Sequence, residues 1–224
     1  MNETPETDSY SNARRQMVER DLISRNIINP EVLRAMARVP RHRFVENSQV
    51  DEAYADRALS IGRGQTISQP YIVAFAAQAL KIEPGDQVLE VGTGSGYSAA
   101  VLAELGATVV SLERDKTLAW MARERLAALG YQRVEVIEGD GSIGWKDQAP
   151  FAAISVAAAA PEIPGALVEQ LQVGGRLVVP IGGRYSGQRL IRVLRTDAGT
   201  RVDDLLGVAF VPLIGNSGWP EAER

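Results

Sequence analysis

The clearest pattern in the chain, from Val88 onward, is an alternation of short apolar runs with longer stretches of helical periodicity. The apolar runs are rich in valine, leucine and isoleucine, as in strands buried on both faces of a parallel sheet. They predict strands over residues 88–91, 108–112, 134–137, 151–156 and 176–180. Helices are predicted between them over residues 97–105, 115–129 and 164–171. This order predicts an α/β, Rossmann-like fold, with a mostly parallel sheet and helices on both faces.

Outside this alternation, the N-terminal part of the chain is predicted to be mostly helical, and the C-terminal part is predicted to form a hairpin. Helices are expected over residues 13–25, from Pro30 to before Pro40, and over the apolar stretch 71–80. We expect residues 1–12 to form a disordered tail, 13–60 a helical lobe packed on the core, and 61–224 the core itself. The lobe and the core are expected to form one structural unit. The closing hairpin is predicted from residues 190–194 and 208–211.

Composition removes several classes of chemistry. The chain has 224 residues with a net charge of −4, which argues against a broad nucleic-acid-binding face. It has no cysteine and one histidine, His42, so we expect no disulfide, no cysteine nucleophile and no metal site. No apolar stretch approaches the roughly 20 residues of a membrane span, and the acidic first residues lack the order of a signal peptide. We therefore expect a cytoplasmic protein.

A glycine-rich turn follows the first strand of the core and is the main candidate for a ligand site. The strand and turn read VLEVGTGSG, and a helix follows. Glycines there let the backbone approach a ligand closely. The expected contacts are Gly92, Thr93, Gly94, Ser95 and Gly96. Glu90 stands inside the apolar run, where a charge is costly without a partner.

Two further acids stand at the ends of the next two strands. Glu113 lies 19 residues after Gly94, where a carboxylate can accept hydrogen bonds from both hydroxyls of a ribose. Asp140 ends the third strand and is expected to accept from an adenine amino group, with Gly141 beside it as a further contact of the cofactor. Because parallel strands end at one edge of the sheet, these acids and the glycine turn predict a pocket for an adenosine-containing cofactor.

The spacing in the turn favours one cofactor over another. A dinucleotide fingerprint places a third small residue where this chain has Tyr97. The carboxylate of Glu90 suits a cationic cofactor such as S-adenosylmethionine better than a pyrophosphate. Two alternatives stay open on the residues alone: the glycines only form a tight turn beside solvated acids, or the cofactor is NAD and the protein an oxidoreductase.

Beyond these local patterns, the chain resembles the protein-L-isoaspartate O-methyltransferases (protein-β-aspartate methyltransferases) over nearly its whole length. The similarity runs through MVERDLISRNI, PEVLRAMARVPRHRFVE, IGRGQTISQPYIVA, VLEVGTGSGYSAAVLAEL, GDGSIGW, AAAPEIP, GGRLVVPIG and FVPLIG. The most specific piece is GQTIS followed by Pro70, which S-adenosylmethionine enzymes in general do not share.

The resemblance implies a repair enzyme that methylates the α-carboxylate of L-isoaspartyl residues in damaged proteins and peptides. The ester then cyclises to a succinimide, and hydrolysis returns some normal aspartate. The implied cofactor is S-adenosyl-L-methionine, with S-adenosyl-L-homocysteine as product. We expect no nucleic-acid or membrane partner and a monomer. Two readings within the same family stay open: methylation of a dedicated peptide, and a homologue that binds the cofactor without catalysis.

The resemblance also assigns residues of the GQTIS loop. Ser68 matches the family's active-site serine, and its hydroxyl is expected to orient the substrate carboxylate. The other expected contacts are Thr66, Ile67 and Gln69 with the cofactor, and Gln65, Thr66 and Val211 with the substrate. A purely structural alternative is that Ser68 and Thr66 cap the helix beginning near Pro70.

The chain departs from the family pattern in a few places. The family often has Tyr-Asp where this chain has Phe151-Ala152, and many members have Thr where it has Ala157. Neither departure touches GQTIS, Glu113 or Asp140.

Overall fold

The computed structural model of the protein describes residues 10–221. It opens on one continuous helical stretch: α1 (Ser11–Gln16), the π-helical turn η1 (Met17–Leu22) and the 3-10 turn η2 (Ile23–Arg25). Asn26, in the left-handed region with φ 66°, ends it. The helix starts at Ser11, so its first two residues belong to the stretch 1–12 that was predicted to be a disordered tail. Residues 1–9 of that tail lie outside the described residues.

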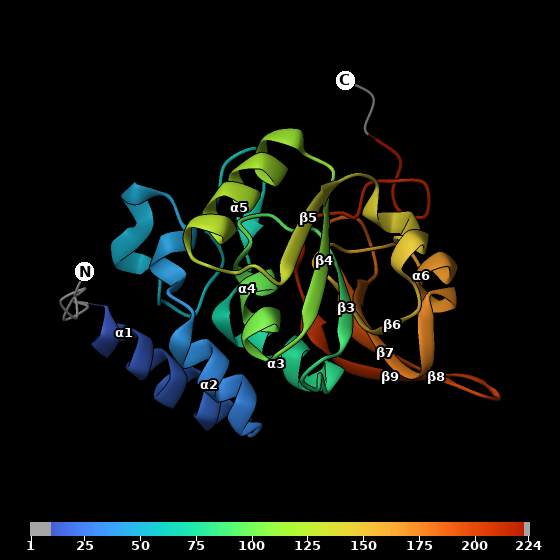
Figure 1. Ribbon diagram of the computed structural model, residues 1–224, viewed down its shortest axis with the longest axis horizontal. Coiled ribbons are helices and arrows are strands. Elements are labelled where there is room, and N and C mark those ends of the chain that lie inside the picture. The colour runs from blue at the N-terminus through green and yellow to red at the C-terminus, as the bar shows by residue number, and fades with distance from the viewer. Residues whose placement is uncertain (1–9, 222–224) are drawn as a thin grey trace.

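Short elements complete the lobe. Asn29 caps α2 (Pro30–Arg38) by accepting hydrogen bonds from two N–H groups of its first turn, with Pro30 at the first helical position. Two 3-10 turns follow, η3 (Arg41–Phe44) and η4 (Asn47–Glu52). A two-stranded hairpin, β1 (Leu59–Ser60) and β2 (Thr66–Ile67), then leads into α3 (Pro70–Leu80). Figure 1 shows the first helical stretch and α2 beside α3 and α4, away from the carboxyl ends of the strands.

The core is a seven-stranded sheet in the order β5-β4-β3-β6-β7-β8-β9. The strands are β3 (Gln87–Val91), β4 (Thr108–Glu113), β5 (Val134–Glu138), β6 (Phe151–Val156), β7 (Leu171–Ile181), β8 (Gln188–Thr196) and β9 (Gly199–Val208). The first five in this spatial order are parallel to one another, β8 pairs antiparallel with β7, and β9 pairs antiparallel with β8. The strand order reverses between β3 and β6, and such switch points are where ligands bind in open α/β sheets.

Apolar side chains of successive strand residues enter two different cores, as the pleat of a strand requires. Val88 of β3 packs with α3, α4 (Tyr97–Glu104), α5 (Lys116–Ala128) and the N-terminal lobe. Leu89 and Val91 face the opposite side, where α6 (Gly165–Glu169) lies. The predicted mostly parallel sheet with helices on both faces is therefore confirmed, and the lobe shares one hydrophobic core with the sheet.

The final hairpin differs from its prediction. Strand β8 spans the predicted residues 190–194, but its partner is β9, at 199–208, rather than 208–211. No residue of β9 is fully buried, because this strand forms the edge of the sheet. A strand with few buried positions lacks the apolar alternation by which strands are recognised in a sequence. Residues 209–213 instead leave the sheet and run over the carboxyl ends of the strands.

Candidate functional site

The glycine turn after β3 takes a backbone conformation that side chains would hinder. Gly92, Gly94 and Gly96 have φ values of 93°, 54° and 88°, in the region that glycine adopts readily. A Cβ on Gly94 would also lie 3.3 Å from Cδ1 of Ile61, a residue of the loop that precedes α3. The turn therefore needs glycine both for its shape and for the close approach of that loop.

Glu113, at the end of β4, is bonded to this turn. One carboxylate oxygen accepts from the Gly94 N–H at 2.9 Å and the other from the Asp115 N–H at 2.9 Å. The side chain is largely buried, yet it lines the cavity above the turn. Each oxygen retains a second lone pair, so the carboxylate can also accept from a ligand. Asp115 in turn caps α5 by accepting from the N–H groups of Thr117 and Leu118.

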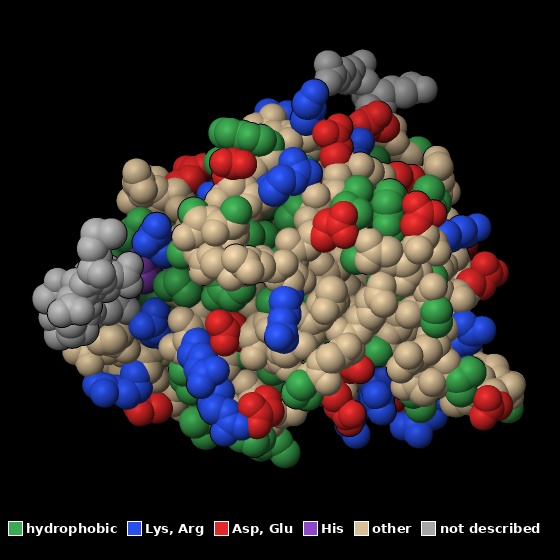
Figure 2. Space-filling model, viewed as in Figure 1, with side chains coloured by type: hydrophobic (Ala, Val, Ile, Leu, Met, Phe, Trp, Pro, Cys, Tyr) green, Lys and Arg blue, Asp and Glu red, His purple; other side chains and the backbone are tan. Residues whose placement is uncertain are grey.

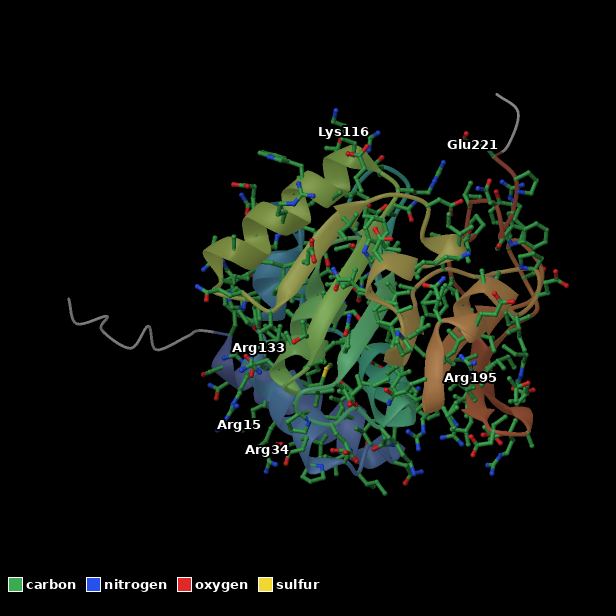
Figure 3. All side chains as sticks on the ribbon, turned by 45° about the vertical axis from the view of Figure 1, so that its right-hand side comes forward. Arg15, Arg34, Lys116, Arg133, Arg195 and Glu221 are labelled. Atoms are coloured by element: carbon green, nitrogen blue, oxygen red, sulfur yellow. The ribbon has the colours of Figure 1, made fainter. Side chains whose placement is uncertain are left out.

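A first cavity opens above the glycine turn at the carboxyl ends of the parallel strands. Lys116, the first residue of α5, follows the carboxyl end of β4 and is labelled at the top of Figure 3. This edge of the sheet is therefore the upper one in that view. Eleven of the predicted site residues line the cavity: Gln65, Thr66, Ile67, Ser68, Gly92, Thr93, Gly94, Ser95, Glu113, Gly141 and Val211. The structure thus brings together residues from five separate segments of the chain.

Glu90 requires a correction, because the structure does not place it at the cavity wall. It shares a strand face with Val88. Its fully buried carboxylate therefore lies on the side of the sheet that α3, α4 and α5 cover, beneath the turn. The Ser111 hydroxyl donates to its Oε2 at 2.5 Å, and Thr93 Oγ1 lies 2.6 Å from Ser111 Oγ. Among the described residues Oε1 has no hydrogen-bond partner. Burial raises the pKa of Glu90 to about 7.

Asp140 is also placed differently from the prediction. Its Oδ1 accepts from the Ser142 N–H at 2.9 Å and its Oδ2 from the Asn216 N–H at 2.8 Å. A Cβ on Gly215 would lie 2.1 Å from that carboxylate, so the C-terminal loop packs directly against it. Asp140 lines a neighbouring cavity beside Trp145 rather than the first cavity. Its carboxylate holds the C-terminal loop in place, which no local sequence pattern indicates.

Two other predicted cofactor contacts lie outside the first cavity. Gly96 is the residue before α4 and serves as its N-cap. Gln69 lines a neighbouring second cavity instead. In both cases the chain has already turned away from the pocket, into α4 or toward α3.

The GQTIS loop is more ordered than its sequence suggests. Ile67 pairs with Leu59 across the β1–β2 hairpin, and its side chain is buried. Ser68 is half-buried, and no hydrogen bond of its hydroxyl to another described residue is present. The N-cap of α3 is Gln69, with no side-chain cap bond. The alternative in which Ser68 and Thr66 cap this helix is therefore wrong.

The second cavity adjoins the first and shares four residues with it: Thr66, Ser68, Ala157 and Val211. The rest of its wall comes from the end of the lobe, the start of α3, the start of β8, the end of β9 and the residues that follow β9. A molecule in either cavity therefore meets Ser68. The small side chain of Ala157, where the family often has Thr, lies at this junction.

Val211 presents one free backbone group to that junction. Its C=O accepts from the Ala159 N–H at 2.8 Å, whereas its N–H has no partner among the described residues. Gln188 holds the preceding residue: its side-chain amide accepts from the Phe210 N–H at 2.6 Å and donates to the Phe210 C=O at 3.1 Å. The Val211 N–H is therefore available to a substrate backbone, whereas its C=O already accepts one hydrogen bond from Ala159.

Some residues of the site were not singled out from the sequence. Arg63, from the loop between β1 and β2, forms an ion pair with Asp115 across the first cavity, and both residues line it. Asp56 bonds to the loop that carries Ser68 and lines the second cavity. Neither has a motif of its own, and each finds its partner only through the fold.

The single histidine of the chain lies away from both cavities. His42 lines neither cavity; its ring stacks on Tyr10 at 4.5 Å and Nδ1 lies 2.9 Å from the Tyr54 hydroxyl oxygen. Within residues 10–221, no three His, Cys, Asp or Glu side chains gather as metal ligands would.

Comparison with known proteins adds an independent result. The family model described as protein-L-isoaspartate(D-aspartate) O-methyltransferase matches residues 12–218. A protein-L-isoaspartate O-methyltransferase of Protochlamydia amoebophila is 52% identical over 204 residues, covering 91% of this chain and 97% of the relative. One of Methanoculleus marisnigri is 50% identical over 214 residues, covering 96% and 97%.

Solved structures agree with these relatives. A Plasmodium falciparum structure, assigned as a protein-L-isoaspartate O-methyltransferase and holding S-adenosyl-L-homocysteine, superposes with a TM-score of 0.77 at 28% identity. The match covers 91% of this chain and 99% of that one. A second protein-L-isoaspartate O-methyltransferase gives a TM-score of 0.83 at 27% identity, covering 92% and 67%.

Proposed function

The chain belongs to the protein-L-isoaspartate(D-aspartate) O-methyltransferase family, and on that premise we propose a division of labour between its two cavities. The protein is an S-adenosylmethionine-dependent methyltransferase that acts on isoaspartyl residues and so initiates their repair. We assign the cofactor to the first cavity and the isoaspartyl peptide to the second. Membership of this family overturns the NAD oxidoreductase alternative.

The residues of the first cavity fit S-adenosylmethionine in shape and in charge. When bound, that cofactor supplies an electrophilic methyl group. Gly92 and Gly94 leave room for close approach of a ligand to the backbone, and Glu113 offers carboxylate lone pairs to ribose hydroxyls. Thr66, Ile67 and Ser68 close the cavity from the side of the loop.

The residues at the junction of the cavities suit a carboxylate that needs no activation. An α-carboxyl group has a pKa of about 3.5 and is already ionised at neutral pH, so no general base is required. The Ser68 hydroxyl can donate to one carboxylate oxygen, and the Val211 N–H can hold the substrate backbone. Positioning of this kind contributes up to roughly 7–11 kcal/mol to such reactions.

The observation that carries the proposal is the position of Ser68 in the walls of both cavities. The test uses S-adenosylmethionine with a radiolabelled methyl group and two matched peptides, one with L-isoaspartate and one with normal aspartate. We expect base-labile label on the isoaspartyl peptide alone. Equal labelling of both peptides would contradict the assigned regiochemistry. Calorimetric binding of the cofactor without any labelling would favour a dedicated peptide substrate or a non-catalytic homologue.

Replacing Ser68 by alanine is expected to lower kcat/KM for the isoaspartyl peptide about tenfold. A hydrogen bond to a charged group is worth about 1.5–3 kcal/mol, and the lower end applies because Ser68 is half-buried. Affinity for the cofactor, measured by calorimetry, should change less than about twofold.

The matched control for this variant is Ser48→Ala, at an exposed position of η4. It should leave both quantities unchanged. A Ser68→Ala enzyme with wild-type kcat/KM would remove Ser68 from the mechanism.

We further propose that the substrates are isoaspartyl-containing proteins and peptides and that neither nucleic acid nor membrane is a partner. The net charge of −4 supports this, and Figure 2 shows basic and acidic side chains interspersed over the face in view. No helix within residues 10–221 has both the length and the apolar character needed to cross a bilayer. A cytoplasmic location and a monomeric state complete the proposal, as does the division into a lobe at 13–60 and a core at 61–224 that act as one unit.

A further inference from the structure

Ser68 is held between two fixed points of the chain. On its N-terminal side, Ile67 pairs with Leu59 in the β1–β2 hairpin and buries its side chain. On its C-terminal side, Gln69 and Tyr71 both hydrogen-bond to Asp56. The hydroxyl that the reaction uses thus depends on neighbours, because Ser68 itself makes no side-chain bond within the described chain.

Asp56 collects all of these bonds on the C-terminal side. Its Oδ1 accepts from the Tyr71 N–H at 3.1 Å, and its Oδ2 from Gln69 Nε2 at 2.6 Å. The same Gln69 nitrogen donates to the Asp56 C=O at 2.9 Å. The Asp56 side chain is only 18% exposed, so these bonds are partly shielded from water. Asp56 lines the second cavity, and both of its carboxylate oxygens already accept hydrogen bonds from the protein.

Arg25 connects this group to the N-terminal lobe. Its Nη1 lies 2.6 Å from Asp56 Oδ2, and its guanidinium carbon lies 3.5 Å from the centroid of the Tyr71 ring. It therefore neutralises the Asp56 carboxylate and covers the aromatic ring of the first turn of α3. The end of the first helical stretch and the loop that carries Ser68 meet at one carboxylate.

We propose that Asp56 is a positioning residue for methyl transfer, which orients Ser68 by holding Gln69 and Tyr71. This inference rests on the proposed function of Ser68. Three donors converge on Asp56, and a carboxylate alone offers acceptors on both oxygens without a donor of its own. An asparagine would retain the acceptor for Tyr71 but present an N–H₂ group toward the donors of Gln69 and Arg25.

The test is a double-mutant cycle on kcat/KM for the isoaspartyl peptide. Asp56→Ala should lower kcat/KM about tenfold, mainly through kcat, while cofactor affinity changes less than about twofold. If Asp56 acts through Ser68, the double variant Asp56→Ala/Ser68→Ala should lose little more than either single variant. An effect of Asp56 on activity that is independent of Ser68 would instead give the product of the two losses, about a hundredfold.

Two further variants keep the test decisive. Asp51→Ala, at an exposed position of η4, is the matched control and should retain full activity. If Asp56→Ala does not fold, Asp56→Asn replaces it in the same cycle, with a smaller expected loss and the same lack of additivity with Ser68→Ala. Either cycle should be measured well below the unfolding temperature of each variant.

The outcomes separate this inference from the function on which it rests. Three results would overturn the role of Asp56 and leave the proposed function standing. They are wild-type activity in the Asp56 variants, multiplicative losses in the double variant, and a fall in cofactor affinity of tenfold or more. Absence of methyl transfer to the isoaspartyl peptide by the wild-type enzyme would overturn the proposed function, and the role of Asp56 with it.

Discussion

Replacing Glu113 by alanine is expected to weaken S-adenosylmethionine binding by about a hundredfold. The variant loses the acceptors for two ribose hydroxyls, and hydrogen bonds to a charged group contribute about 1.5–3 kcal/mol each, so a loss of about 3 kcal/mol is a cautious sum. It also frees the Gly94 N–H, which Glu113 holds at 2.9 Å. Calorimetric titration with the cofactor or with S-adenosylhomocysteine measures the effect directly.

The chain offers a close control for this variant. Glu138 ends β5 and stands beside Glu113 in the strand register, but it is exposed and lines neither cavity. Glu138→Ala should bind the cofactor like the wild type. Similar affinities for Glu113→Ala and Glu138→Ala would show that the acid at the end of β4 does not bind the ribose.

The second large effect is on stability and involves Glu90. Its pKa is about 7 in the folded protein against 4.5 for an unperturbed glutamate. Between these values the folded state binds a proton that the unfolded state has released, so the free energy of unfolding falls as pH rises. The stabilisation that protonated Glu90 gives to the folded state is complete below pH 4.5 and is lost once the pH passes about 7. A shift of this size corresponds to about 3 kcal/mol.

Glu90→Gln should remove this dependence, because a glutamine has no charge to bury. We expect its free energy of unfolding, relative to the wild type, to rise by about 3 kcal/mol between pH 4.5 and pH 8. Urea denaturation across this range provides the measurement. Glu124→Gln, at an exposed position of α5, is the control and should follow the wild-type curve. Parallel curves for Glu90→Gln and the wild type would show that Glu90 is not the buried group that titrates.

Prediction from the sequence succeeded where a feature depends on neighbouring residues. Four of the five parallel strands, all but the edge strand β5, were found because each contains an apolar run buried on both faces. The helices predicted over 13–25 and 115–129 are likewise set by local signals: Asn26 ends the first in the left-handed region, and Asp115 caps the start of the second. Strand β9 was misplaced because an exposed edge strand lacks that local signal.

The sequence by itself therefore determined the α/β alternation, the glycine turn and the acid at the end of β4, and its motifs identified the family. Only the tertiary structure decided where the side chains of Glu90 and Asp140 go. Glu90 turns toward Ser111 of the neighbouring strand, and Asp140 bonds to Asn216, 76 residues away. Such partners are set by strand register and chain crossings rather than by local spacing. The same reason hides Asp56 in the sequence: its role exists only once the lobe, the loop and α3 have met.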